Sequence, residues 1–453
     1  MADDHHPGYV PRFFTEGALT QDFPTEGMDP RAAYQLVRQE VSFDGDPWRN
    51  LATFVTTWME PEAQDLIAES LHTNFIDHAE YPRAADIERR CVRMLGDLFN
   101  APAQTTGARC QGSSEAIMLG ALAAKWRWRK AREATGADTS TPNLVYGRDV
   151  HVVWDKFCRY FDVEPRTVPM AEGKYTIGPG DIEALIDENT IGVVAVLGTT
   201  FTGQADDVAG INDLLLSIRS ERGLDVPIHV DAASGGFVWP FIYPDTSWDF
   251  RLEQVHSINV SGHKFGLVYP GIGWLVFRHS DDLPEELVFY ENYLGETDAT
   301  FTLNFSTGSS KMVAQYYNFC RLGRAGYTEA IGAMKTNAEW LAAGLLESGR
   351  FDLIGADGEQ LPLVCFRVTG DPAFDERDVA GQVAMDRGWM LPAYSLPPNA
   401  EGVTVLRALV RSNLSRSAAE TLLADIVGAC ETLDRKGGLH PDARARVRAG
   451  TGY

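Results

Sequence analysis

The sequence predicts an α/β fold with a large, mainly parallel sheet and a second, smaller α/β unit toward the C-terminus. Through the middle of the chain, short runs rich in β-branched and aromatic residues alternate with helical patterns. Buried strands that alternate with helices indicate a parallel sheet covered on both faces. A long amphipathic segment then runs from 304 to about 346, and shorter strand and helix patterns follow it.

The elements follow in order along the chain. Apolar residues at helical spacing predict helices at 63–71 and 85–99. Strand patterns of the large sheet fall at 143–146, 166–170, 191–197, 227–231, 257–260 and 273–277. Helical patterns at 179–186 and 207–222 lie between them. The smaller unit is predicted to contain strands near 363–368 and 403–410 and a closing helix at 418–432.

A chain of 453 residues is too long for one simple core, so we expect one large domain with smaller parts around it. The predicted parts are an N-terminal arm over 1–48, a large domain over 49–334, a small C-terminal domain over 335–440 and a tail over 441–453. His5 and His6 lie in the arm, where we expect solvated side chains and no metal site.

Charge and cysteine content restrict the partners and the compartment. The formal net charge is −23, and such a surface repels nucleic acid and anionic lipid, so we expect neither as a partner. The six cysteines show no Cys-x-x-Cys spacing and indicate reduced thiols. The chain opens Met-Ala-Asp-Asp without a following apolar run, and its longest apolar stretches are only strand-sized. These features favour a cytoplasmic protein.

The first cluster with chemical content is Gly-Ser-Ser-Glu-Ala at 112–116, directly before a helical run at 117–130. Small residues at the start of a helix let backbone N–H groups approach a phosphate, and the helix dipole favours its charge. The hydroxyls of Ser113 and Ser114 can add donors. The plainer alternative is a helix N-cap made by one of these serines.

Two further clusters follow strand patterns. Asp231 lies at the end of an apolar strand, where open α/β sheets bind ligands, and its carboxylate could pair with a pyridinium nitrogen. Lys264 lies between another apolar strand and a Gly-flanked turn, and a lysine kept unprotonated can form a Schiff base with a carbonyl cofactor. Each alone also fits an ordinary turn or surface residue. Their order behind a candidate phosphate loop is far more specific.

This set resembles the pyridoxal-phosphate-dependent group II amino-acid decarboxylases, and most closely the bacterial and plant glutamate decarboxylases. The resemblance extends from about 50 to about 430. It includes Asn-Leu-Ala-Thr-Phe at 50–54, Asn-Phe-Ile-Asp at 74–77, Tyr-Pro at 81–82, Lys-Trp-Arg-Trp-Arg-Lys at 125–130, Asp-Phe-Arg at 249–251 and Ala-Gln-Tyr-Tyr at 314–317. It implies the fold-type I transferase-like architecture, with a seven-stranded sheet and a smaller C-terminal domain.

The resemblance also implies how pyridoxal 5'-phosphate is held. Lys264 corresponds to the Schiff-base lysine and Asp231 to the partner of the ring nitrogen. His151 is expected to stack on the ring, which Thr200 and Ala233 frame. The residues expected at the phosphate are Ser113, Ser114, Ser261 and His263, with Ser306 from the neighbouring subunit.

The implied reaction converts L-glutamate to 4-aminobutanoate and carbon dioxide through an external aldimine and a quinonoid. Arg407 is expected to receive the α-carboxylate. The distal carboxylate is expected to meet Thr53 and Phe54, with Asn74 and Asp77 from the neighbouring chain. An Asp77 beside a bound carboxylate implies a preference for acidic pH. Tyr293 is the candidate that returns a proton to Cα, with Lys264, His263 and His151 as the other catalytic candidates.

Two positions depart from the glutamate decarboxylase pattern. His151 and Gln111 resemble the wider decarboxylase group, which includes aromatic and histidine decarboxylases. Decarboxylation of another amino acid, or an oxidative deamination, therefore stays open, although the presence of Tyr293 argues against oxidation. A non-catalytic scaffold is the remaining alternative, and the presence of Lys264, Asp231 and Arg407 argues against it.

The resemblance implies self-association as well. Residues shared between active sites require at least a homodimer, and a hexamer stays open. The C-terminal tail contains arginines but no Trp or aliphatic stripe, which argues against calmodulin binding.

Overall fold

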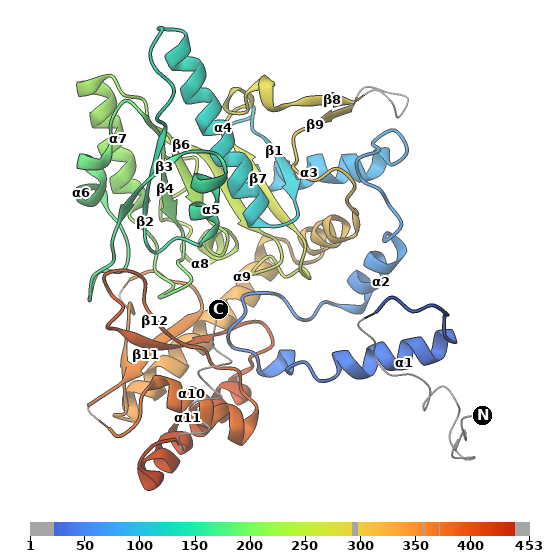
Figure 1. The fold of residues 1–453 in the computed structure, drawn as a ribbon, viewed down its shortest axis with the longest axis vertical. Helices are drawn as coiled ribbons and strands as arrows, with labels where there is room; N and C mark the ends of the chain where they lie inside the picture. The colour runs from blue at the N-terminus through green and yellow to red at the C-terminus, as the bar shows by residue number, and fades with distance from the viewer. Residues whose placement is uncertain (1–21, 292–297, 357, 371, 440–453) are drawn as a thin grey trace.

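The computed structural model describes residues 22–291, 298–356, 358–370 and 372–439. Its main feature is a seven-stranded sheet in the order β1-β7-β6-β5-β4-β2-β3 (Figure 1). The strands are β1 (Thr106–Cys110), β2 (Asn143–Gly147), β3 (Glu164–Val168), β4 (Thr190–Val196), β5 (Ile228–Asp231), β6 (Val255–Ser261) and β7 (Gly273–Phe277). Strands β3, β2, β4, β5 and β6 run parallel, whereas β7 is antiparallel to both β6 and β1.

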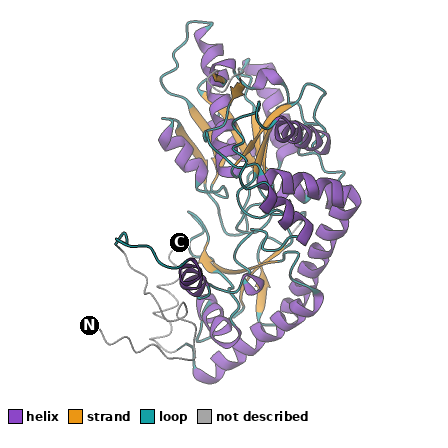
Figure 2. Ribbon diagram, turned by 90° about the vertical axis from the view of Figure 1, so that its right-hand side faces the viewer, coloured by secondary structure: helices purple, strands orange, loops and turns teal. Residues whose placement is uncertain are grey.

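The large sheet is buried on both faces, which explains its apolar strands. In β4, Val193 and Ala195 pack into one core, and Val194 and Val196 pack into another on the opposite face. The first core includes residues of α3 (Pro82–Leu98), α7 (Val208–Arg222), α8 (Trp239–Ile242) and α9 (Ser310–Glu347). The second includes residues of α4 (Ser113–Glu133) and α5 (Val153–Tyr160). Helices flank the strands in the side view as well (Figure 2).

A smaller antiparallel sheet follows in the order β10-β11-β13-β12. Its strands are β10 (Phe351–Leu353), β11 (Leu363–Val368), β12 (Ala393–Ser395) and β13 (Thr404–Leu409). Helix α10 (Glu376–Arg387) and the end of α9 pack against this sheet, and α11 (Arg416–Lys436) packs against both of these helices. Helix α9 is interrupted at Gly323, where a positive φ of 55° breaks the helical backbone.

Further elements surround the two sheets. They are α1 (Pro30–Val41), α2 (Pro61–Glu69), α6 (Pro179–Ile182) and the hairpin of β8 (Phe289–Glu291) and β9 (Asp298–Thr300). No helix in the described part of the chain is long and apolar enough to cross a lipid bilayer.

The structure confirms the predicted fold class and places a strand at each of the six predicted positions of the large sheet. The seventh strand, β1, was not located from the sequence. Strand β3 begins two residues earlier than predicted, and the helices α1, α5 and α10 were missed. Helix α1 lies within the predicted arm over 1–48. The predicted domain boundaries stay predictions. Helix α9 continues across the predicted boundary at 334.

Candidate active site

A cavity of about 450 Å³ opens at the carboxyl ends of the parallel strands, where open α/β sheets bind ligands. The loops after β2, β4, β5 and β6 and the N-terminus of α4 form its walls. The predicted site residues found in its lining are Ser113, Ser114, His151, Thr200, Asp231, Ala233, Ser261, His263 and Lys264. Nine positions scattered over more than 150 residues thus converge on one space.

One end of the cavity is suited to a phosphate. Helix α4 begins after Gly112 without a side-chain cap, which leaves its first N–H groups available and does not support the N-cap alternative. The hydroxyls of Ser113 and Ser261 are 2.7 Å apart and tie the loop to the end of β6. A Cβ at Gly273 would lie 2.5 Å from the carbonyl carbon of Gly112, so only glycine allows this approach of β7.

Asp231 lies opposite this end and is surrounded by donors. Its Oδ2 accepts from the indole N–H of Trp154 at 2.9 Å, and its Oδ1 accepts from Asn259 at 3.0 Å and from the backbone N–H of Ala233 at 3.2 Å. The side chain is almost completely buried. A buried carboxylate with this many donors is suited to pair with a cationic ring nitrogen.

A polar ladder between β5 and β6 lies behind Asp231. The register pairs Asp231 with Asn259 and His229 with Ser257. His229 contacts Ser257 Oγ through Nδ1 and Asn259 Oδ1 through Nε2, both at 2.7 Å. Because the Asn259 amide donates to Asp231, its oxygen must accept, which assigns the proton to Nε2 of His229. Burial lowers the pKa of His229, in keeping with this neutral ring.

Lys264 projects into the cavity from the loop after β6. Its Nζ donates to the hydroxyl of Ser234 at 3.1 Å. Burial lowers the pKa of Lys264, Asp231 opposes this effect and the guanidinium of Arg407 adds to it, so the pKa is lowered to about 8. About a tenth of an amine with this pKa is neutral at pH 7, far more than for an ordinary lysine, and the neutral form is the one that attacks a carbonyl.

Two histidines line the cavity beside this lysine. His151 accepts from the backbone N–H of Val153 through Nδ1 at 3.3 Å, which leaves Nε2 free to serve the cavity. Desolvation by the surrounding protein lowers the pKa of His151, and the positive charge of Lys264 lowers it as well. Burial, again with Lys264, lowers the pKa of His263 to about 4, and its buried Nδ1 has no partner among the described residues. Both rings are therefore neutral near pH 7.

Arg407 and Phe54 form the side of the site that adjoins the small sheet. The Phe54 ring lies 5.2 Å from Nζ of Lys264 and 4.9 Å from the guanidinium of Arg407. Arg407 donates to the carbonyl oxygens of Thr200 and Ala52. No carboxylate forms an ion pair with Arg407 in the described ranges, so its charge is available to an anionic ligand.

Thr53 stands next to Phe54, in a segment that β13 and its following loop hold in place. The Thr53 hydroxyl accepts from the backbone N–H of Val55 at 3.2 Å. Arg411 donates to the carbonyl oxygens of Pro47, Asn50 and Val55. This segment therefore has a defined position relative to Arg407.

Three predicted residues lie away from this cavity within the chain. Asn74 and Ser306 are exposed, and Asn74 pairs through a β-bridge with Gly308, so they occupy one region of the surface. Asp77 lies in the same turn, where it accepts from the N–H of Glu80 at 3.0 Å. None of the three lines the cavity. Tyr293 lies outside the described residues.

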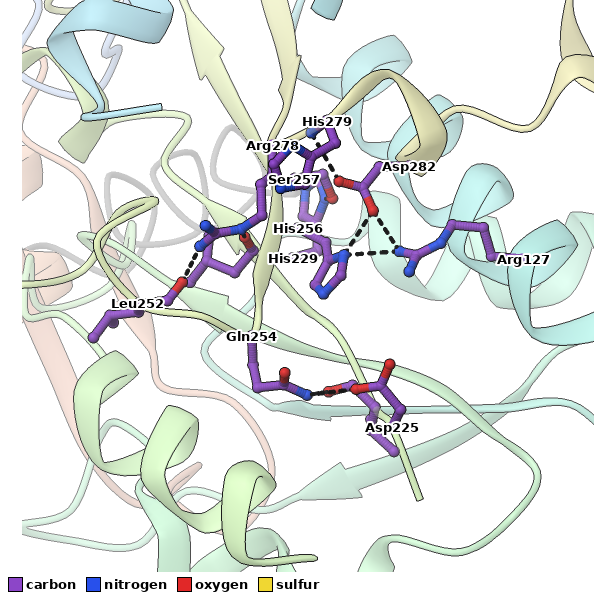
Figure 3. A network of polar contacts seen from close by, with 12 residues as sticks. Arg127, Asp225, His229, Leu252, Gln254, His256, Ser257, Arg278, His279 and Asp282 are labelled. Atoms are coloured by element: carbon purple, nitrogen blue, oxygen red, sulfur yellow. Dashed lines mark hydrogen bonds and ion pairs between the residues drawn. The ribbon is translucent and has the colours of Figure 1, made fainter. Parts of the chain in front are cut away.

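An ion-pair network anchors the far end of α4 (Figure 3). Asp282, which follows β7, accepts from Arg127 of α4 at 2.9 Å and contacts Nδ1 of His256 on β6 at 2.6 Å. Its second oxygen accepts from the N–H of His279 at 3.0 Å. Burial opposes ionisation of Asp282, but these contacts outweigh it and lower its pKa. The network holds α4 against the sheet and so helps to direct its N-terminus into the cavity.

Sequence reasoning missed several residues that support the site. Ser234, the partner of Lys264, directly follows the Asp-Ala-Ala motif. Trp154 and Asn259 both donate to Asp231. The alternation of polar residues at 257, 259 and 261 of β6 was a signal for one polar face of that strand.

The cavity fits pyridoxal phosphate on its own geometry. An uncapped helix N-terminus and two serines suit the phosphate, a buried carboxylate suits the ring nitrogen, and a lysine of lowered pKa suits the aldehyde. An enzyme that holds a phosphorylated carbonyl cofactor through a lysine is the class of protein that this fold and cavity define.

Comparisons with known proteins agree with this class. The chain belongs to the family of pyridoxal-dependent decarboxylases, whose conserved domain matches residues 25–369. A glutamate decarboxylase of Petunia hybrida is 46% identical over 433 residues, which cover 95% of this chain and 86% of the relative. Glutamate decarboxylase beta of Listeria innocua is 42% identical over 442 residues, 95% of each chain. The solved glutamate decarboxylase of Lactobacillus brevis has a TM-score of 0.89 and 41% identity, covering 93% of this chain and 96% of that one.

Proposed function

We propose that the protein is a glutamate α-decarboxylase, which converts L-glutamate to 4-aminobutanoate and carbon dioxide. The observation that carries the proposal is the position of Arg407, a guanidinium without a carboxylate partner in the described ranges, beside the same Phe54 ring that Lys264 contacts. The similarity to glutamate decarboxylases of plants and bacteria over nearly the whole chain supports the same substrate.

The chain's own residues orient the substrate. When bound, pyridoxal phosphate supplies a protonated ring that takes up the electrons released as carbon dioxide leaves. Arg407 binds the α-carboxylate and fixes its direction, because its two outer nitrogens are already anchored on the carbonyl oxygens of Thr200 and Ala52. The Phe54 ring lies beside both Arg407 and Lys264.

A proton must return to the carbon that lost the carboxylate. Tyr293 is our candidate donor, with Lys264 and His263 as alternatives. The low pKa of His263 leaves that ring neutral near pH 7. The N–H of a neutral imidazole is a weaker acid than a lysine ammonium, so His263 is the weaker of these two alternatives. The Lys264 ammonium, with a pKa of about 8, is a better acid and lies in the cavity.

We further propose that the working unit is at least a homodimer in the cytoplasm. The exposed region that contains Asn74, Asp77 and Ser306 would then complete the neighbour's site, which accounts for its distance from the cavity of its own chain. Mixing a Lys264→Ala subunit with an Asp77→Ala subunit tests this. One intact site per mixed dimer should restore part of the activity, and no recovery in mixed dimers argues against shared sites.

Product analysis tests the substrate. Purified enzyme with pyridoxal phosphate is given each common amino acid at mildly acidic and at neutral pH, and carbon dioxide, amine, ammonia and oxygen uptake are measured. Glutamate alone should yield 4-aminobutanoate and carbon dioxide in equal amounts, with higher activity at acidic pH. Carbon dioxide from another amino acid, or oxygen uptake with ammonia release, contradicts the proposal and directs attention to His151 and Gln111.

A further inference from the structure

Glu115 is a buried carboxylate at the start of α4 that the proposed reaction does not use. It is the third residue of the helix and is 8% exposed. Its Oε2 accepts from the backbone N–H of Gln111 at 2.7 Å. The bond resembles a capping box, in which a glutamate at this position reaches back to an N–H just before the helix. Glu115 therefore holds the phosphate loop, residues 111–114, from within its own chain.

The second oxygen of Glu115 binds a distant part of the chain. Its Oε1 accepts from the backbone N–H of Leu303 at 2.9 Å and from that of Asn304 at 3.3 Å. Both of these residues are exposed, so the carboxylate holds a segment of the surface. A carboxylate has two acceptor oxygens, and Glu115 uses one for the phosphate loop and the other for this segment. The two parts of the chain are thus joined through a single side chain.

The 303–308 segment is anchored at its other end as well. The guanidinium of Arg109, which is buried on β1, donates to the hydroxyl of Thr307. The carbonyl oxygen of Thr307 accepts from the backbone N–H of Phe75 at 2.7 Å. Ser306 lies between these anchors and the bonds to Glu115, and its side chain is exposed. The position of Ser306 therefore depends on bonds at both ends of the segment.

We propose that Glu115 is a positioning residue for two active sites. It holds the phosphate loop of its own chain, and through the 303–308 segment it holds Ser306 for the site of the neighbouring subunit. This role rests on the shared active sites proposed above. Asn74 is attached to the same segment, because it pairs with Gly308 through a β-bridge. A change of Glu115 in one subunit should therefore weaken cofactor binding in both sites of the dimer.

Glu115→Gln removes the double link with little change in size. The amide has one acceptor oxygen and one donor group, so it cannot accept from both Gln111 and the 303–308 segment. Whichever way the amide turns, one set of N–H groups loses its acceptor. The matched control is Glu133→Gln, which changes the net charge equally at the exposed far end of the same helix, outside the cavity.

Mixed dimers of two differently tagged subunits separate the two roles. One subunit always carries Lys264→Ala, so covalent capture of pyridoxal phosphate, followed by absorbance, reports only the site of the other subunit. Glu115→Gln is placed either in the subunit with the intact lysine, the cis arm, or in the Lys264→Ala subunit, the trans arm. The Kd of pyridoxal phosphate should rise by about tenfold or more in cis and by about three- to tenfold in trans. Glu133→Gln should change neither.

Ser306→Ala in the trans arm is the reference, and it should raise the Kd by about tenfold or more. If it does so while Glu115→Gln has no effect in trans, the link through Glu115 is overturned and the shared sites stand. If neither acts in trans, the shared sites fall and the role of Glu115 falls with them. An unchanged Kd in the cis arm overturns the role at the phosphate loop.

A second variant covers the case in which Glu115→Gln subunits do not fold. Glu115→Asp keeps the charge on a side chain that is one carbon shorter, so it cannot reach both the phosphate loop and the 303–308 segment. It is measured in the same two arms, with the same expected and contradicting results. Because no step uses an amino-acid substrate, the result is independent of the proposed specificity for glutamate.

Discussion

Asn259 donates a hydrogen bond of 3.0 Å from its amide to Oδ1 of Asp231, across two neighbouring parallel strands. The same amide group accepts from His229 at 2.7 Å through its oxygen. Asn259 therefore connects the carboxylate that faces the cavity to a buried histidine behind it. Because an amide has a defined donor end and a defined acceptor end, this arrangement determines the direction of both bonds.

Replacement of Asn259 by alanine should weaken cofactor binding. The change removes one donor from Asp231 and leaves the N–H of His229 without its acceptor. Loss of a hydrogen bond to a charged group costs about 1.5–3 kcal/mol, so the Kd of pyridoxal phosphate should rise by about 10- to 100-fold. Absorbance titration of the apoenzyme measures this.

The matched control is Asn413→Ala, which removes a half-buried amide that donates to the carbonyl oxygen of Trp48 at 3.4 Å, away from the cavity. Its Kd should equal that of the wild type. An unchanged Kd in Asn259→Ala would show that Trp154 and the N–H of Ala233 are sufficient to hold Asp231.

Gly273→Ala should disrupt the phosphate end of the cavity. The added Cβ would lie 2.5 Å from the carbonyl carbon of Gly112 and 2.8 Å from the backbone nitrogen of Ser113, and backbone atoms cannot turn away as a flexible side chain can. The start of α4 must move, so affinity for pyridoxal phosphate should fall by about tenfold or more.

Gly428→Ala provides the opposite expectation for the same chemical change. Gly428 lies inside α11, and a Cβ there meets nothing within 4 Å. Alanine should stabilise that helix by about 0.5–1 kcal/mol without affecting the cofactor. Equal cofactor affinity in the two variants would mean that the contact between β7 and the phosphate loop is not tight.

The rate at which the apoenzyme captures pyridoxal phosphate should rise with pH. Burial lowers the pKa of Lys264 to about 8, and only the neutral amine attacks an aldehyde. The rate should increase about tenfold per pH unit below pH 8 and level off above it. Rapid-mixing absorbance measures the rate, and Lys264→Ala should show no covalent capture. A midpoint near the ordinary lysine value would contradict the burial of the amine.

The same shift affects apoenzyme stability. The folded-state pKa of Lys264 lies below its unfolded value, so the neutral form favours the folded state. Its contribution is fully present above about pH 10.4 and is lost as the pH falls through 8. Relative to Lys264→Met, the wild type should therefore lose stability as the pH falls across this window. Thermal unfolding at a series of pH values checks the sign.

Much of the site was predictable from the sequence because local patterns carry it. Asp231 ends one buried strand and Lys264 follows another, and parallel strands end at the same edge of a sheet. Strand β1 was missed since its run, Thr-Gly-Ala-Arg-Cys, is short and polar, and only its pairing with β7 makes it a strand.

The residues that hold the site residues in place were harder to predict, because their positions depend on strand register. Nothing local in the sequence places Asn259 opposite Asp231 or brings Trp154 to the same carboxylate. Asn74, Asp77 and Ser306 were predicted from a family resemblance that implies a second chain, and their role stays a prediction.

Arg407→Lys should impair substrate binding more than cofactor binding. Lysine keeps the charge but lacks the planar fork that reaches the carbonyl oxygens of Thr200 and Ala52 while facing the site. Loss of such a charge-assisted contact should raise the KM for glutamate by about 10- to 100-fold and lower kcat, whereas the Kd of pyridoxal phosphate should change little. Steady-state kinetics with parallel absorbance titration separate the two effects.

Arg367→Lys is the matched control, because Arg367 lies on β11 of the same small sheet and pairs at the surface with Glu172 at 3.0 Å. An exposed pair of this kind contributes about 0–1 kcal/mol, so kinetics should be unchanged. If Arg407→Lys instead weakens the cofactor and leaves KM unaltered, Arg407 supports the loop that contains Thr200 and does not bind the α-carboxylate. The anion site would then have to be sought elsewhere around Phe54.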